Sequence, residues 1–190
     1  KEALALFRAQ DDPFWIAGTL LSLGWVVRHM ARYDELVEFL DEGIAICRRH
    51  AYRSHLAHAL DLLAFAAVEQ GRLETAEAHL AEALTIAQEI SNPGNVARSQ
   101  RGFGVIQLLR GRFAEGSPYL DQAEAGYREM GHRSGQVFTT TWQAFARMHQ
   151  GRYDEAAALA VRGTEEGRSI NHRGVLANGL LILGQLRLVE

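Results

Sequence analysis

GRLETAEAHLAEALTIAQEI, residues 71–90, decides the fold because its pattern returns along the chain. Stretches of the same pattern start at Gly111 and Gly151, each 40 residues after the one before, and an earlier version, ARYDELVEFLDEGIAICRRH, starts at Ala31. Self-similarity at a fixed interval of about 20 to 50 residues indicates structural units that stack on their neighbours. The chain is therefore built mainly from one repeated unit.

Each unit contains two predicted helices. Small or apolar residues recur three and four positions apart before the Gly-Arg turn at residue 71, and this spacing resumes after it. Such spacing places side chains on one face of a helix, so we expect an all-α chain. The positions are Leu60, Leu63, Ala64 and Ala67 in the first helix, named helix A, and Leu73, Ala76, Leu80 and Ala83 in the second, named helix B.

The turn between helices A and B explains why glycine recurs at one position of the repeat. Gly71, Gly111 and Gly151 stand where helix A must stop. Glycine adopts the left-handed conformation that ends many helices without a Cβ penalty. Ala31 stands at the same place in the earliest turn, at a cost of about 1 kcal/mol if its backbone is the same.

Composition excludes several classes of protein. The 190 residues are 47% hydrophobic and 23% charged, with a formal net charge of −3, so no broad positive field attracts nucleic acid. No apolar run is long enough to span a membrane. One cysteine, Cys47, forms no internal disulfide. We expect a cytoplasmic protein that contacts neither nucleic acid nor membrane.

The repeats predict one array over residues 1–190. The first residues match the end of a helix B, and the last residues match a helix A with no helix B after it. Neither end has the polar capping repeat of a natural array, so we expect a fragment of a longer protein. The predicted parts are a helix B end at 1–10, helix pairs at about 13–50, 54–90, 94–130 and 134–170, and a further helix A at 173–190.

The unit resembles the tetratricopeptide repeat. That family places Leu-Gly in helix A and a small residue early in helix B. The corresponding positions here are Leu23-Gly24, Leu63-Ala64, Phe103-Gly104 and Leu183-Gly184 in helix A, and Ala76 and Ala156 in helix B. The resemblance implies an all-α, right-handed α-α superhelix of antiparallel helix pairs that binds proteins or peptides and holds no cofactor.

The period of 40 is longer than the usual 34 of that family. It resembles the variant in bacterial LuxR-type and maltose-regulator-type activators and predicted signalling ATPases, where the repeats serve as a sensor or docking arm. The chain itself lacks the Gly-x-x-x-x-Gly-Lys-Ser/Thr phosphate loop of an ATPase. We therefore expect a docking or sensor region of a bacterial regulator, and no enzyme.

The resemblance also places a binding groove, because helix A lines the concave surface of such arrays. Exposed aromatic side chains among charges of both signs suit a protein or peptide partner. Trp25, Phe65 and Phe145 fit the core between repeats as well. The candidate groove residues are Trp25, Arg28, His58, Asp61, Phe65, Glu69, Arg98, Arg101, Phe145 and Met148.

Other readings of the sequence are a pocket for a small effector and self-association through the uncapped ends. A metal site is not expected: His55 and His58 share a helical face, but only Asp61 follows as a third ligand. Arg48 and Arg49 follow Cys47 and favour a reactive thiolate only if they fold over it. We expect Cys47 to be a small buried residue instead.

Overall fold

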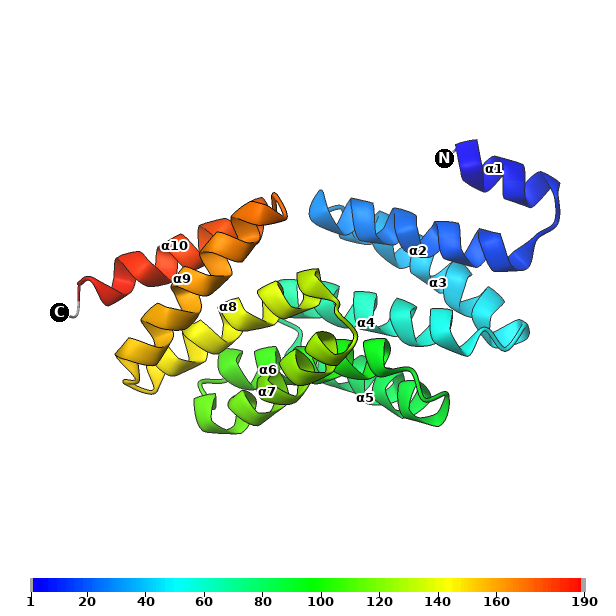
Figure 1. Cartoon of the computed structure of the whole chain (residues 1–190). Coiled ribbons are helices and arrows are strands. Elements are labelled where there is room, and N and C mark those ends of the chain that lie inside the picture. Colours follow the sequence, from blue (N-terminus) through cyan, green and yellow to red (C-terminus); the bar gives the residue numbers. More distant parts are fainter. Residues whose placement is uncertain (1, 189–190) are drawn as a thin grey trace. The chain divides into compact units, whose positions relative to one another are not determined.

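The computed structural model describes residues 2–188, and every regular element in this range is an α-helix (Figure 1). Residue 1 and residues 189–190, at the outer ends of the predicted segments 1–10 and 173–190, lie outside the described residues. The helices are α1 (Glu2–Ala9), α2 (Pro13–His29), α3 (Tyr33–Arg49), α4 (Arg53–Glu69), α5 (Leu73–Glu89), α6 (Pro93–Leu109), α7 (Phe113–Glu129), α8 (Arg133–His149), α9 (Tyr153–Ser169) and α10 (Arg173–Leu186).

The chain folds as two compact parts, each larger than one repeat, which divide between Ser99 and Gln100 inside α6. From here on, the part up to Ser99 is called the first unit and the part from Gln100 the second unit. The all-α prediction is confirmed. The prediction that both units belong to one array with the stated boundaries stays a prediction.

Each turn between helices has the same backbone conformation and hydrogen bonding. Ala31 has a φ of 55°, which confirms that it adopts the left-handed conformation expected of a glycine there, and Gly71 has a φ of 74°. The amide of the next residue then reaches back to the helix, as in Arg32 N to Val27 O at 3.0 Å. This is the hydrogen bond of a Schellman motif. Left-handed residues recur every 20 positions, at Asp11, Ala31, Ala51, Gly71, Ser91, Gly111, Gly131, Gly151 and Asn171.

The repeated turn gives helices of one length. From α2 to α9 each helix has 17 residues. Residues that are 40 positions apart therefore occupy the same place in successive A helices or successive B helices. This register determines which side chains meet between repeats.

The first unit packs α2, α3, α4 and α5 around a shared core. Leu36, Leu40 and Leu60 are almost fully buried there. The A helices α2 and α4 contact each other directly, as do the pairs α2 with α3 and α4 with α5. Side chains of α2 that point toward α4 therefore form one surface together with the facing side chains of α4.

The second unit packs α8 against α7, α9 and α10. Small side chains allow the close approach of α6 and α7 within this unit. A Cβ on Gly116 would lie 2.3 Å from Cδ1 of Leu108 and 2.9 Å from the carbonyl oxygen of Gly104. Gly116 is therefore required by packing and not by a turn.

Replacing Ala31 by glycine should stabilise the protein. The substitution removes the Cβ strain of a left-handed residue at an exposed site, which is worth about 1 kcal/mol in the free energy of unfolding. Urea unfolding measures the change. The matched control is Ala45→Gly in the exposed middle of α3, where glycine should cost about 1 kcal/mol. Equal destabilisation by both variants would contradict the prediction.

Replacing Gly116 by alanine should destabilise the protein, although alanine favours helix. The added methyl group overlaps Leu108 and the Gly104 carbonyl oxygen, and such overpacking typically costs about 1 to 3 kcal/mol. Gly184→Ala in α10 is the control, because nothing lies within 4 Å of its Cβ position. That variant should gain roughly 0.5 kcal/mol. Thermal unfolding distinguishes the two signs.

Candidate functional site

A cleft of about 410 Å³ lies between the A helices α2 and α4 of the first unit. Its lining residues are spaced three and four apart on each helix, which places them on the two facing sides. Gly18 has no side chain, and a Cβ there would lie 3.4 Å from Nε2 of His55. The lining consists of Gly18, Leu21, Ser22, Trp25 and Val26 from α2 and of His55 and His58 from α4.

The cleft is mainly apolar and holds no charged side chain. Trp25 is 51% exposed and Val26 is 41% exposed, so both present apolar surface to solvent. The Trp25 ring contacts His29 with 4.4 Å between centroids. His55 is held edge-on by Phe14, with 4.7 Å between ring centroids. The polar side-chain groups of the lining are therefore a hydroxyl, an indole N–H and two imidazoles.

His58 is neutral in this cleft. Its pKa is lowered from 6.5 to about 3, mainly by burial and then by the Arg98 guanidinium and His55. Burial also lowers the pKa of His55. A neutral imidazole offers one donor and one acceptor to a bound group.

An ion pair joins α2 and α4 at one end of the cleft. Arg28 donates to both carboxylate oxygens of Glu69, at 3.1 Å and 2.7 Å. The guanidinium carbon of Arg28 also lies 5.5 Å from the centre of the Phe65 ring. The structure thus brings together three of the predicted groove residues. The charges of Arg28 and Glu69 balance each other, so the three residues add no net charge to this surface.

Asp61 departs from the sequence-based expectation. It was predicted as a groove residue, but it is 0% exposed and cannot contact a partner directly. Its Oδ1 accepts a hydrogen bond from Ser99 Oγ at 2.8 Å, and its Oδ2 lies 3.8 Å from Nη1 of Arg98. A buried carboxylate requires such partners. Asp61 therefore joins α4 to the first part of α6, and the predicted Arg98 is its counter-ion.

The remaining predicted residues lie in the second unit. The guanidinium carbon of Arg101 lies 5.5 Å from the Tyr127 ring centre and 5.6 Å from that of Phe138. Phe145 and Met148 are partly buried against the core of α8, α9 and α10. Phe145 also lines a cleft of about 170 Å³ between α8 and α10, with Thr141, Trp142, Asn178, Leu181, Ile182 and Gln185. The prediction that all these residues share one groove stays a prediction.

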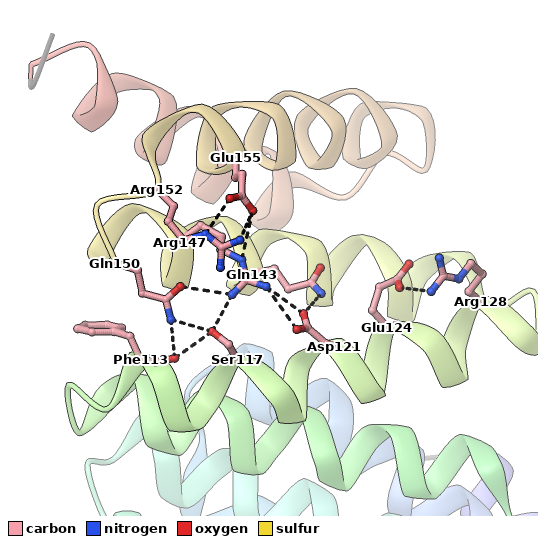
Figure 2. Close-up of polar contacts among 10 residues, drawn as sticks. All are labelled: Phe113, Ser117, Asp121, Glu124, Arg128, Gln143, Arg147, Gln150, Arg152 and Glu155. Carbon is pink, nitrogen blue, oxygen red and sulfur yellow. Dashed lines mark hydrogen bonds and ion pairs between the residues drawn. The ribbon is translucent and has the colours of Figure 1, made fainter.

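Sequence reasoning missed a polar cluster that joins α7, α8 and α9 (Figure 2). Arg147 lies at its centre, with a side chain that is 13% exposed. It donates to Ser117 Oγ at 2.9 Å and pairs with Asp121 at 3.3 Å and Glu155 at 3.8 Å. These partners stand at unequal separations in the sequence, so no periodic pattern reveals them.

A metal site and the Cys47 thiol are the two chemical candidates that the sequence raises. Across 2–188 no three side chains of His, Cys, Asp or Glu gather as a metal site would require. Burial raises the pKa of Cys47 to about 11, so the thiol is protonated at neutral pH and behaves as a small buried residue. No helix in this range is long and apolar enough to cross a membrane.

Comparison with known proteins identifies relatives. The tetratricopeptide repeat model matches residues 55–129. Regulatory protein AfsR of Streptomyces coelicolor is 29% identical over 114 residues, and the match covers 60% of this chain and only 12% of that protein.

Two solved structures share the fold. Aspartyl phosphate phosphatase F from Bacillus subtilis has a TM-score of 0.75 at 16% identity, and the match covers 90% of this chain and 45% of that one. A Rap protein complexed with competence and sporulation factor has a TM-score of 0.73 at 15% identity, over 97% of this chain and 63% of that one. At such identities the likeness establishes the fold class alone, which is the predicted solenoid of helix pairs.

Lowering the pH should destabilise the protein partly through His58. Its pKa is about 3 in the folded chain and 6.5 when exposed. The unfolded chain therefore binds a proton first as the pH falls below 6.5, and stability is lost from there toward pH 3. His58→Gln should remove about 1 kcal/mol of the loss between pH 6 and pH 5. Urea unfolding at pH 7, 6 and 5 measures it, and an unchanged slope in the variant would contradict the prediction.

Proposed function

Since this chain carries repeats of the tetratricopeptide family, matched over residues 55–129, we propose that it is a protein-interaction scaffold. Its proposed partner is a peptide segment of another protein, which lies along the A helices. The single observation that carries this proposal is the uncharged cleft between α2 and α4. The proposed site there consists of Trp25, Leu21, Val26, His55 and His58.

The chemistry of the cleft specifies the kind of segment. Arg28 is occupied by Glu69, and Arg98 lies beside Asp61, so the strong charges near the cleft are already paired. A charged side chain would lose hydration on entry and gain no counter-ion. An apolar or aromatic side chain gains contact with Trp25 and Val26. Aromatic anchors in such surfaces usually carry most of the binding energy.

A rigid surface strengthens this kind of binding. The Arg28–Glu69 pair and the contact of Phe65 with Arg28 fix α2 relative to α4 before any partner arrives. A preformed cleft avoids part of the entropy cost of ordering side chains on association. The scaffold can therefore bind with a small number of anchors.

A regulatory role is the finer part of the proposal. The match to a regulatory protein covers 60% of this chain but 12% of that relative. We place this chain in the docking region of a bacterial regulator of that kind, where the repeats bind a partner and other parts of the protein produce the output. A small effector in the same cleft is the alternative, because its volume falls within the range of small-molecule pockets.

Selection from a library of random dodecapeptides on the whole chain tests the cleft. We expect selected peptides to share one aromatic or aliphatic position and to lose about tenfold in affinity when Trp25 is replaced by alanine. Trp15→Ala is the matched control, since Trp15 is 53% exposed and Trp25 is 51% exposed, and Trp15 does not line the cleft. Fluorescence anisotropy measures both affinities.

Two outcomes would overturn the proposal. One is a set of peptides without an apolar consensus position. The other is equal loss of affinity in the Trp15 and Trp25 variants, which would point to a surface elsewhere on the chain.

A further inference from the structure

A repeated ion pair joins successive B helices in the first unit. Arg8 of α1 donates to Glu42 of α3 at 2.6 Å, and Arg48 of α3 donates to Glu82 of α5 at 2.9 Å. The partners of each pair are 34 residues apart, and the two pairs are separated by one 40-residue repeat. The register of the helices thus places an arginine of one helix B opposite a glutamate of the next.

The second unit breaks this rule. The corresponding positions are Arg128 of α7 and Arg162 of α9, which are also 34 residues apart. A second arginine therefore replaces the expected glutamate. Both side chains line a cleft of about 320 Å³, which also contains Glu124, Gln143, Arg147, Glu155, Ala158 and Leu159. At the position where the first unit has an Arg–Glu ion pair, the second unit has a solvent-open cleft lined by two arginines, Arg128 and Arg162.

The two arginines have weak or local partners. Arg128 pairs at 2.8 Å with Glu124 of its own helix (Figure 2), and its side chain is 66% exposed. Arg162 donates to the hydroxyl of Thr140 at 3.3 Å, and no carboxylate among the described residues forms an ion pair with it. Like charges that face one cleft repel each other, and a bound anion removes that repulsion.

We propose that this cleft binds a carboxylate of an acidic peptide segment, which occupies the place of the missing glutamate between Arg128 and Arg162. This site lies on α7, α8 and α9 and is separate from the α2–α4 cleft, so it extends the proposed function to a second surface. The carboxylates of Glu42 and Glu82 show that this register accommodates that group.

The charge of the cleft fits a monoanion. Its lining holds Arg128, Arg147 and Arg162 against Glu124 and Glu155. Asp121 also pairs with Arg147, and Arg152 with Glu155, so four arginines face three carboxylates and one positive charge remains. A carboxylate balances that charge, whereas a phosphate dianion exceeds it. Guanidinium groups suit a carboxylate because their paired donors match its two oxygens.

The neighbouring polar groups suit a peptide. Nε2 of Gln143 donates to Asp121 at 2.8 Å. The Oε1 of Gln143 is buried and accepts no hydrogen bond within the described residues. A main-chain amide beside the bound carboxylate supplies the kind of donor that this oxygen lacks.

The test compares two blocked hexapeptides, one with glutamates at its centre and one with glutamines, by calorimetry on the whole chain at low salt. The glutamate peptide should bind at least about fivefold more tightly. Arg162→Glu should abolish that preference, because residue 162 then carries the carboxylate itself, and Arg162→Gln should reduce it. Arg173→Glu is the matched control: it makes the same change of charge at an exposed residue outside the cleft and should keep the preference.

A second measurement separates loss of the site from loss of the fold. Arg162→Glu restores the Arg–Glu pattern of the first unit, so its thermal midpoint should be equal to or higher than that of the unmodified chain. Equal binding of the two peptides, a preference that survives Arg162→Glu, or a preference lost equally in Arg173→Glu would overturn the proposal. Inorganic phosphate that binds more tightly than the glutamate peptide would overturn it too.

Discussion

The turn between helices is the constraint on which the rest of the structure depends. At each junction within residues 2–188 one residue adopts the left-handed conformation, and the following amide bonds back to the helix, as Arg72 does to Ala67 at 2.8 Å. The device ends each helix and satisfies carbonyl groups that a helix end leaves without partners. Since it recurs every 20 residues, helices of equal length follow, and within each unit equal helices align side by side.

Alignment of the helices determines which side chains meet. The Arg28–Glu69 pair and the contact between Asp61 and Ser99 both join A helices of neighbouring repeats. The Arg48–Glu82 pair joins B helices. None of these contacts is local in the sequence, yet each follows from helix length and register. The α2–α4 cleft arises in the same way, because residues at one register of α2 face those at one register of α4.

The sequence predicts the parts of the structure that periodicity encodes. Spacing of apolar residues predicts the helix pairs, and the glycines predict three of the turns. The repeat bounds predict further turns near residues 51–53, 91–93 and 171–172, but not which residue is left-handed there, because Ala51, Ser91 and Asn171 adopt the conformation that glycine has elsewhere. Burial of Asp61 also escapes a periodic analysis. His58 and Phe65 on the same helix face were expected in the groove with it, whereas the Ser99 hydroxyl and Arg98 from another repeat stabilise its buried carboxylate.

Packing and exposure together determine where such a chain can change its binding properties with little loss of stability. Gly116 cannot gain a side chain without displacing Leu108, and Ala156 and Ala160 are fully buried between helices, so packing restricts these positions. Arg128 and Arg162 stand on exposed B-helix surfaces, where an ion pair contributes only about 0.2 to 1 kcal/mol. Exchange of a glutamate for an arginine there costs little stability, but it changes a closed contact into a charged cleft. The B helices can therefore acquire new partners without altering the repeat, whereas the buried small residues keep the repeat itself intact.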